Sequence, residues 1–340
     1  MDIPSALAQL ADGRDLTRDD SYALFKAIMS GDATPAQTGA LLTALRMKGA
    51  GAEEVAGAAS AMRELSARVE VDAPHLVDTC GTGGSGAKLF NVSTAAAFVT
   101  AAAGAHVAKH GNRKASSQSG SADLLEAAGA NIQLDPEQIA HCVREVGVGF
   151  MFAQAHHPAM RHVAPVRTEL RIPTVFNILG PMTNPAGARR QVIGVYDPNW
   201  QRTMAEVLQM LGTEHALVVH SDGLDEIGLA APTHVVELKD DEIHEFDVTP
   251  EDLGITSGST DALTADSIGS SLKLVKESLE APDSRAADLV ALNAGAAIYV
   301  SGVATSFANG VVMAQDAIAS GLAKEKMTEF VRITSLMAED

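Results

Sequence analysis

A run of closely spaced glycines, Gly81 to Gly86, could bind a phosphate group. It follows a short apolar segment, Leu76–Asp78, and precedes a helix predicted from about Ser93. Glycines let backbone N–H groups approach an anion closely, and a helix N-terminus adds the positive end of its dipole. A plain tight turn would not need four glycines in six residues. The run therefore predicts a phosphate-bearing ligand.

Two familiar nucleotide motifs fit this run poorly. A P-loop ends in Gly-Lys-Ser/Thr, whereas Gly86 is followed by Ala87, Lys88 and Leu89. The run matches the dinucleotide pattern G-x-G-x-x-G, but that pattern also requires an acid about 20 residues later, at the end of the next strand. Here the next predicted strand ends in Lys109 and His110. A ribose diol would meet a cation there, which disfavours an oxidoreductase.

The basic segment after that strand is better interpreted as a second anion-binding element. Lys109, His110, Arg113 and Lys114 lie within six residues. The polar segment Asn91–Thr94 lies between the two elements at a predicted helix N-terminus, although Ser93 or Thr94 could serve only as a helix cap. All three elements fall where ligands bind in open α/β sheets, at the carboxyl ends of strands.

Composition limits the classes of function. The chain has 340 residues, enough for about two domains, with 46% hydrophobic and 4% aromatic residues and a formal net charge of −18. That charge disfavours nucleic-acid and membrane partners. Two cysteines without metal or disulfide spacing, and an N-terminus without a signal-peptide pattern, favour a cytoplasmic setting.

The predicted elements place these motifs in an α/β fold. Three helices precede residue 70, from Thr17 to Gly31, Thr34 to Gly49 and Ala52 to Ser66. Strands and helices then alternate, which predicts a mostly parallel central sheet with flanking helices. The Pro- and Gly-rich stretch from His157 to Gly187 interrupts that alternation. Residues 233–248 predict a polar hairpin, and two long Ala-rich helices are expected from Arg285.

The motifs, taken in order, resemble those of the anthranilate phosphoribosyltransferase family. The similar segments are Asp78–Gly84, Asn91–Thr94, Lys109–Arg113, Val166–Leu170, Asn177–Pro185 and Asp222–Glu226. The resemblance implies a small helical domain, residues 1–72 completed by an inserted segment at about 160–187, and a larger α/β domain, residues 73–340. It also implies an active site between the domains, a homodimer formed through the helical domain, and Mg²⁺ as cofactor.

The same resemblance implies roles for individual residues. Phosphoribosyl diphosphate would be held by Gly81, Gly84, Ser85, Asn91, Ser93, Thr94, Lys109, Ser117 and Ser121. Anthranilate would be held by Asn112 and Arg167, with His110 as a polar contact or proton relay. Mg²⁺ would be bound by Ser93, Asp225 and Glu226. Further substrate contacts are expected from Leu89, Val92, Arg113, Gly180 and Pro181.

Two positions depart from the family pattern. Ser85 stands where relatives usually carry Asp, and Leu89 stands where they often carry Thr. A serine hydroxyl can donate to a phosphate but offers no charge to magnesium. Two alternative functions share the fold: a pyrimidine nucleoside phosphorylase, whose own motif is not found here, and a non-catalytic paralogue that binds nucleic acid, which the charge of −18 disfavours.

Overall fold

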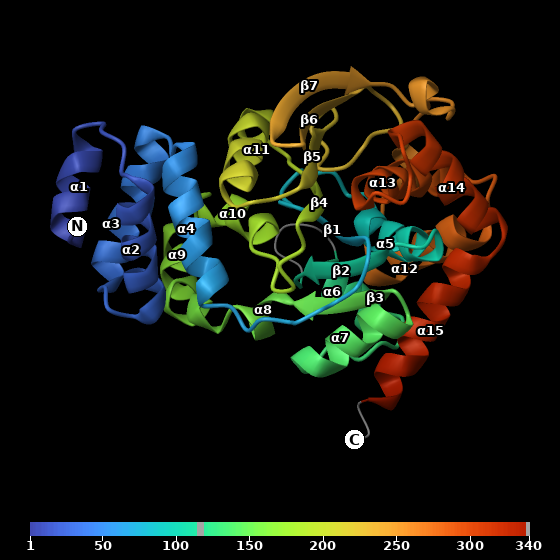
Figure 1. Ribbon diagram of the computed structural model, residues 1–340, viewed down its shortest axis with the longest axis horizontal. Coiled ribbons are helices and arrows are strands. Elements are labelled where there is room, and N and C mark those ends of the chain that lie inside the picture. The colour runs from blue at the N-terminus through green and yellow to red at the C-terminus, as the bar shows by residue number, and fades with distance from the viewer. Residues whose placement is uncertain (114–118, 338–340) are drawn as a thin grey trace.

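A seven-stranded sheet forms the centre of the molecule (Figure 1). The computed structural model describes residues 1–113 and 119–337. The strand order is β3-β2-β1-β4-β5-β6-β7. The first five strands of this order run parallel, and β6 and β7 are antiparallel additions at one edge. The mostly parallel sheet is therefore confirmed. The strands are β1 Leu76–Gly81, β2 His106–Gly111, β3 Val148–Phe152, β4 Arg190–Gly194, β5 His215–His220, β6 Thr233–Lys239 and β7 Glu242–Val248.

Four N-terminal helices form a bundle to one side of the sheet, drawn in blue in Figure 1. They are α1 Ile3–Ala11, α2 Arg18–Ser30, α3 Pro35–Lys48 and α4 Ala52–Glu64. Thr17 and Thr34 cap α2 and α3 through their side chains, as the sequence predicts. The helix α1 was not predicted, although Asp2 accepts a hydrogen bond from Ser5 N–H and Pro4 lies in its first turn.

The segment that interrupts the alternation crosses back to this bundle. It contains α8 Ala153–His156, η1 Pro158–His162, α9 Ala164–Leu170, α10 Phe176–Leu179 and η2 Gly180–Met182. Here η1 packs against α2, and α9 packs against α3. These contacts agree with an insertion that completes the bundle. The domain boundaries at residues 72 and 73 stay a prediction.

The expectation of two C-terminal helices after Arg285 was wrong. Three helices follow that residue, α13 Arg285–Ser301, α14 Phe307–Ala319 and α15 Leu322–Leu336. Gly302 ends α13 in a left-handed conformation, and Ser306 caps the start of α14. A Cβ on Gly310 would lie 2.2 Å from the Gly295 carbonyl oxygen, so the glycines allow α13 and α14 to cross closely.

Three hydrophobic clusters cover the sheet. The smallest packs Ile139 and Cys142 of α7 (Pro136–Glu145) on Ala108 of β2 and Met151 of β3. Of the two larger clusters, one contains α5 (Val92–Ala102), α13 and residues of β1 and β5, and the other joins the bundle to α11 (Gln201–Met210), β4 and β5. The remaining elements are α6 Ser121–Ala127, α12 Ile268–Glu280, η3 Pro198–Trp200, η4 Glu251–Leu253 and η5 Asp261–Leu263. Among the described residues, no helix is both long and apolar enough to cross a membrane.

Candidate active site

The glycine loop leaves the carboxyl end of β1 with an unusual backbone. Gly83, Gly84 and Gly86 have φ values of 66°, 88° and 68°, a region that residues with a Cβ rarely adopt. The Gly83 N–H donates a 2.9 Å hydrogen bond to Oδ2 of Asp225. The nearby Ser85 side chain lowers the pKa of the same carboxylate, although burial raises it overall. The loop is therefore tied to the acidic segment that follows β5.

Two glycines make room for that acidic segment. A Cβ on Gly194, at the end of β4, would lie 1.7 Å from the Asp225 carbonyl oxygen. A Cβ on Gly81 would lie 2.7 Å from Asp225 Oδ2. Asp225 therefore sits across the ends of two adjacent strands. Gly194 was not predicted as important, and only its position at a strand end could have suggested it.

The carboxylates of Asp225 and Glu226 occupy an unfavourable setting for negative charge. Burial raises the pKa of Asp225, and burial together with the neighbouring Asp225 charge raises the pKa of Glu226 to about 7. The Ser93 hydroxyl donates a 2.6 Å hydrogen bond to Glu226 Oε1. The three predicted metal ligands are thus adjacent, because the loop after β5 meets the first turn of α5.

This trio fits a magnesium ion that also binds a phosphate-bearing substrate. Mg²⁺ is commonly held by one or two carboxylates, substrate phosphates and water rather than by a full set of protein ligands. A cation would relieve the repulsion that raises the pKa of Glu226. In the described part of the chain, no three His, Cys, Asp or Glu side chains form a metal-binding cluster. The carboxylate pair therefore suits a shared site.

Lys109 brings a buried positive charge beneath the glycine loop. Its side chain is 4% exposed, and its Nζ donates to the carbonyl oxygen of Thr79 on the adjacent strand. Burial lowers the pKa of Lys109, and the nearby Asp78 carboxylate offsets part of that decrease. One Asp78 oxygen accepts from the His110 N–H at 3.1 Å, and the other is buried without a hydrogen-bond partner among the described residues. The positive charge of Lys109 and the negative charge of Asp78 therefore compensate each other.

Arg113, part of the predicted anion-binding segment, is paired with carboxylates of the same chain. Its guanidinium pairs with Glu126 at 2.8 Å and with Asp123 at 3.3 Å, and it lies 5.3 Å from the Phe152 ring. Its charge is thus directed to α6 rather than to the glycine loop. The positions of Lys114 and Ser117 lie outside the described residues. Ser121, at the start of α6, donates a 3.4 Å hydrogen bond to the Asn112 carbonyl oxygen.

The predicted contact residues around the α5 N-terminus are largely engaged by other parts of the protein. Asn91 Oδ1 accepts hydrogen bonds from the hydroxyls of Ser119 and Ser271, both at 2.7 Å, and Thr94 is buried. The Val92 side chain is fully buried in the core, and its N–H donates to Phe90 O at 2.7 Å. Leu89 packs against the same core. The Val92 side chain is closed off by the core, so a substrate contact at that position would have to use backbone atoms, whereas Leu89 is only partly buried.

A cavity of about 600 Å³ connects the strand ends to the inserted segment. It brings together six predicted site residues: Gly81, His110, Asn112, Arg167, Gly180 and Pro181. Arg167 lies on α9 with its guanidinium carbon 5.5 Å from the Phe176 ring centre, and burial lowers its pKa. No carboxylate among the described residues forms an ion pair with Arg167. It can therefore receive an anionic group in the cavity.

Two buried histidines form one wall of this cavity. The ring centres of His110 and His157 lie 5.1 Å apart in an edge-to-face arrangement. Burial lowers the pKa of both rings, to about 4 for His157, and neither Nε2 atom has a hydrogen-bond partner within the described part of the chain. His157 was not predicted as a site residue. Its place just beyond the β3 strand end, a third strand end beside β1 and β2, could have identified it.

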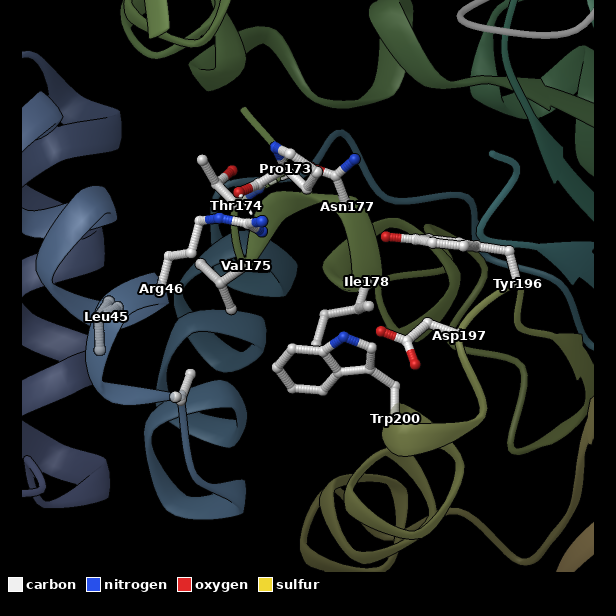
Figure 2. A pocket seen from close by; sticks show the side chains of 12 residues that line it. Leu45, Arg46, Pro173, Thr174, Val175, Asn177, Ile178, Tyr196, Asp197 and Trp200 are labelled. Carbon is white, nitrogen blue, oxygen red and sulfur yellow. Dashed lines mark hydrogen bonds between the residues drawn. The ribbon is translucent and has the colours of Figure 1, made fainter. Parts of the chain in front are cut away.

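A second, smaller cavity of about 320 Å³ lies beside the first. Figure 2 shows Arg46 reaching from the end of α3 toward Pro173, with Trp200 beside Ile178. Asn177 lines both cavities, and the Tyr196 ring lies 3.4 Å from where a Gly84 Cβ would be. The smaller cavity contains none of the predicted site residues. It therefore borders the candidate site without forming part of it.

Comparison with known proteins identifies the family. Residues 4–66 match the helical bundle domain of the glycosyl transferase family, and residues 73–324 match its a/b domain. The chain is 54% identical to the anthranilate phosphoribosyltransferase of Hahella chejuensis, with all of both chains covered. The crystal structure of that enzyme from Thermus thermophilus has a TM-score of 0.91 at 42% identity, covering 97% of this chain and 99% of that one. The Saccharomyces cerevisiae enzyme, solved in complex with PRPP and Mg, has a TM-score of 0.88 at 26% identity, covering 98% of each chain.

Proposed function

The chain belongs to the glycosyl transferase family that includes the anthranilate phosphoribosyltransferases, and from this premise we propose that it catalyses their reaction. It transfers the phosphoribosyl group of 5-phosphoribosyl 1-diphosphate to the amino group of anthranilate, releasing pyrophosphate, in tryptophan biosynthesis. The observation that carries this proposal is the cavity in which Gly81 of the phosphate loop and the half-buried cation Arg167 line the same space.

Anthranilate binds in the cavity, and the donor's phosphates bind beside its Gly81 edge at the glycine loop. Backbone N–H groups of the glycine loop, the α5 N-terminus and Lys109 hold the phosphates of the donor. Arg167 pairs with the carboxylate of anthranilate, and Asn112 contacts the same substrate. Aligning an amine with the ribose C1 carbon in this way removes much of the entropic barrier of a two-substrate reaction.

His110 is suited to a neutral role in this mechanism. Burial and the neighbouring histidines lower its pKa well below the ordinary value, so the ring is neutral near pH 7. Its Nε2, which is free of partners among the described residues, can accept a hydrogen bond or a proton as the substrate amine forms its bond to carbon. The aromatic amine is itself neutral and nucleophilic at that pH, so no strong base is required.

Asp225, Glu226 and Ser93 would hold Mg²⁺ together with the diphosphate. When bound, the ion supplies charge stabilisation for the departing pyrophosphate. The chain's own contribution is to place two carboxylates beside the glycine loop, through the hydrogen bonds of Gly83 and Ser93. The remaining substrate contacts assigned by family resemblance, including Gly84, Ser85 and Ser121, belong to the same proposal.

The assembly and setting of the enzyme are also proposed. A homodimer formed through the helical domain is proposed from the family resemblance, and Met47 on α3, which is 82% exposed, offers a position on that domain at which to test it. Sedimentation of wild type and Met47→Glu would test it, because a dimer through this face should dissociate in the variant. A single wild-type species at monomer mass would contradict the dimer. A cytoplasmic setting agrees with two free cysteines.

A coupled fluorescence assay tests the activity directly. Loss of anthranilate fluorescence should require phosphoribosyl diphosphate and Mg²⁺ together. Parallel assays with thymidine and phosphate test the nucleoside phosphorylase alternative. Turnover of thymidine without consumption of anthranilate would overturn the proposal.

A further inference from the structure

We infer that Arg63, on the last turn of α4, is a positioning residue for the wall of the aromatic-substrate cavity. This inference rests on the proposed function and adds a residue outside the cavity to it. Arg63 connects the helical bundle to the turn η2, whose residues Gly180 and Pro181 line the cavity. The substrate whose binding it controls is therefore the aromatic carboxylate, rather than the phosphoribosyl donor.

Arg63 makes backbone contacts with two separate elements. Its Nε donates a 2.8 Å hydrogen bond to the Met182 carbonyl oxygen at the end of η2. Its Nη1 donates at 3.4 Å to the carbonyl oxygen of Leu211, which caps the end of α11. The planar guanidinium can bond both carbonyls at once, which an ammonium group on a flexible chain does less well.

The cation is held without a carboxylate partner. None of the ion pairs among the described residues includes Arg63, and burial alone lowers its pKa to about 10. Arg63 is partly buried, and a charge that loses hydration without a counter-ion needs its hydrogen bonds to protein carbonyls as compensation. The two carbonyls at the ends of η2 and α11 are its partners.

The turn that Arg63 contacts orients several residues of the cavity. Gly180 and Pro181 line the cavity together with His110 and His157. From the sheet, Gln191 Nε2 donates to the Pro181 carbonyl oxygen at 2.8 Å. The turn is therefore fixed to the sheet by Gln191 and to the bundle by Arg63. Loss of the bundle anchor would displace the part of the cavity wall formed by Gly180 and Pro181.

A neighbouring arginine provides a matched control. Arg18, at the start of α2, also reaches the end of α11, donating from Nη1 to the Met210 carbonyl oxygen at 3.3 Å. Its other hydrogen bond runs to Ser60 within the bundle, rather than to η2. Removing Arg18 weakens the junction between the bundle and α11 but leaves the cavity wall anchored. A purely structural role for Arg63 would make the two variants behave alike.

The experiment measures steady-state constants for both substrates in wild type, Arg63→Ala, Arg63→Lys and Arg18→Ala. We expect Arg63→Ala to raise KM for anthranilate roughly tenfold, because small displacements in a binding site are costly. KM for phosphoribosyl diphosphate should change less than about twofold, and Arg18→Ala should change neither. Arg63→Lys keeps the cation and should fall between Arg63→Ala and wild type. If Arg63→Ala does not fold, Arg63→Lys is compared with Arg18→Ala in its place.

The outcomes separate this inference from the proposed function. If wild type does not consume anthranilate, the proposed function fails. If wild type is active but the Arg63 variants match Arg18→Ala, the positioning role is overturned. An equal rise in KM for both substrates would also overturn it, since that result indicates general loss of the domain junction.

Discussion

The Ser93 hydroxyl donates a 2.6 Å hydrogen bond to Glu226 although 133 residues separate them in the chain. The bond joins the first turn of α5, an anion-binding position, to the acidic loop after β5. The residues proposed to bind phosphate and the residues proposed to bind the metal are therefore already positioned together before either the phosphate or the metal binds. Pre-organisation of this kind reduces the cost of ordering the site on binding.

Gly194→Ala should disrupt the metal site from a position outside it. The added Cβ would lie 1.7 Å from the Asp225 carbonyl oxygen, so the acidic loop must move. We expect a higher magnesium concentration for half-maximal rate, measured by titration of the steady-state rate. Gly269→Ala, in the first turn of α12, is the control, because no atom lies within 4 Å of a Cβ placed there. Equal magnesium dependence in the two variants would contradict this expectation.

Lys109→Met should weaken donor binding and also lower stability. Removing the ammonium leaves Asp78 buried without its compensating charge, which we expect to cost about 1–3 kcal/mol. Thermal unfolding and the KM for phosphoribosyl diphosphate are the measurements. The double variant Lys109→Met with Asp78→Asn should recover stability but not donor binding. Recovery of both would show that Lys109 acts only on the fold.

Arg167→Ala should affect anthranilate selectively. A buried Arg–carboxylate pair commonly costs about 2–5 kcal/mol when one partner is truncated, so KM for anthranilate should rise far more than that for the donor. Arg171→Ala is a suitable control, since Arg171 is exposed just after α9. A larger effect of Arg167→Ala on the donor would reassign this residue to the phosphate end.

Much of this architecture could be predicted because local signals agreed with the tertiary structure. Thr17 and Thr34 begin helices where expected, and the glycine loop follows its strand. The sequence could not reveal which partner each polar group selects. Arg113 belongs to the predicted anion-binding segment, yet it pairs with Glu126 on the following helix. The partner is apparent only in the structure, where α6 brings Glu126 beside Arg113.

Residues outside recognisable motifs were missed for a related reason. His157 and Gly194 act through contacts with His110 and Asp225, which lie far from them in sequence. A histidine before a proline and a glycine at the end of a strand are both common for purely structural reasons. The residue types alone therefore do not indicate a functional site. Only the arrangement of the strand ends gives them a place in the site.

The buried histidine pair should make stability depend on acid pH. His157 binds a proton near pH 4 in the folded protein but near its ordinary 6.5 when unfolded. The unfolded chain therefore binds more protons between these values, and stability present above pH 6.5 is lost as the pH falls toward 4. The neighbouring His110 and His156, also with lowered pKa values, act in the same direction.

The test is the free energy of unfolding measured from pH 7 to pH 4. We expect the free energy of unfolding to fall less in His157→Gln than in wild type, by up to about 3 kcal/mol. This amount corresponds to the difference between the folded and unfolded pKa values of His157. His141→Gln on the exposed face of α7 is the control and should retain the wild-type pH dependence. Identical curves for His157→Gln and wild type would show that His157 does not contribute.

The Ser85→Asp change tests how the glycine loop interacts with magnesium. The Ser85 side chain interacts with the Asp225 carboxylate, so an aspartate there would place a second carboxylate near an already buried one. We expect this repulsion to destabilise the metal-free protein and to increase its attraction for a cation. Magnesium should therefore raise the melting temperature of Ser85→Asp more than that of wild type. The rate should also reach half its maximum at a different magnesium concentration.

Ser85→Ala, which removes the hydroxyl without adding charge, separates the loss of the serine from the gain of a carboxylate. Superimposable magnesium titrations for wild type and Ser85→Asp would limit Ser85 to a phosphate contact or a turn residue.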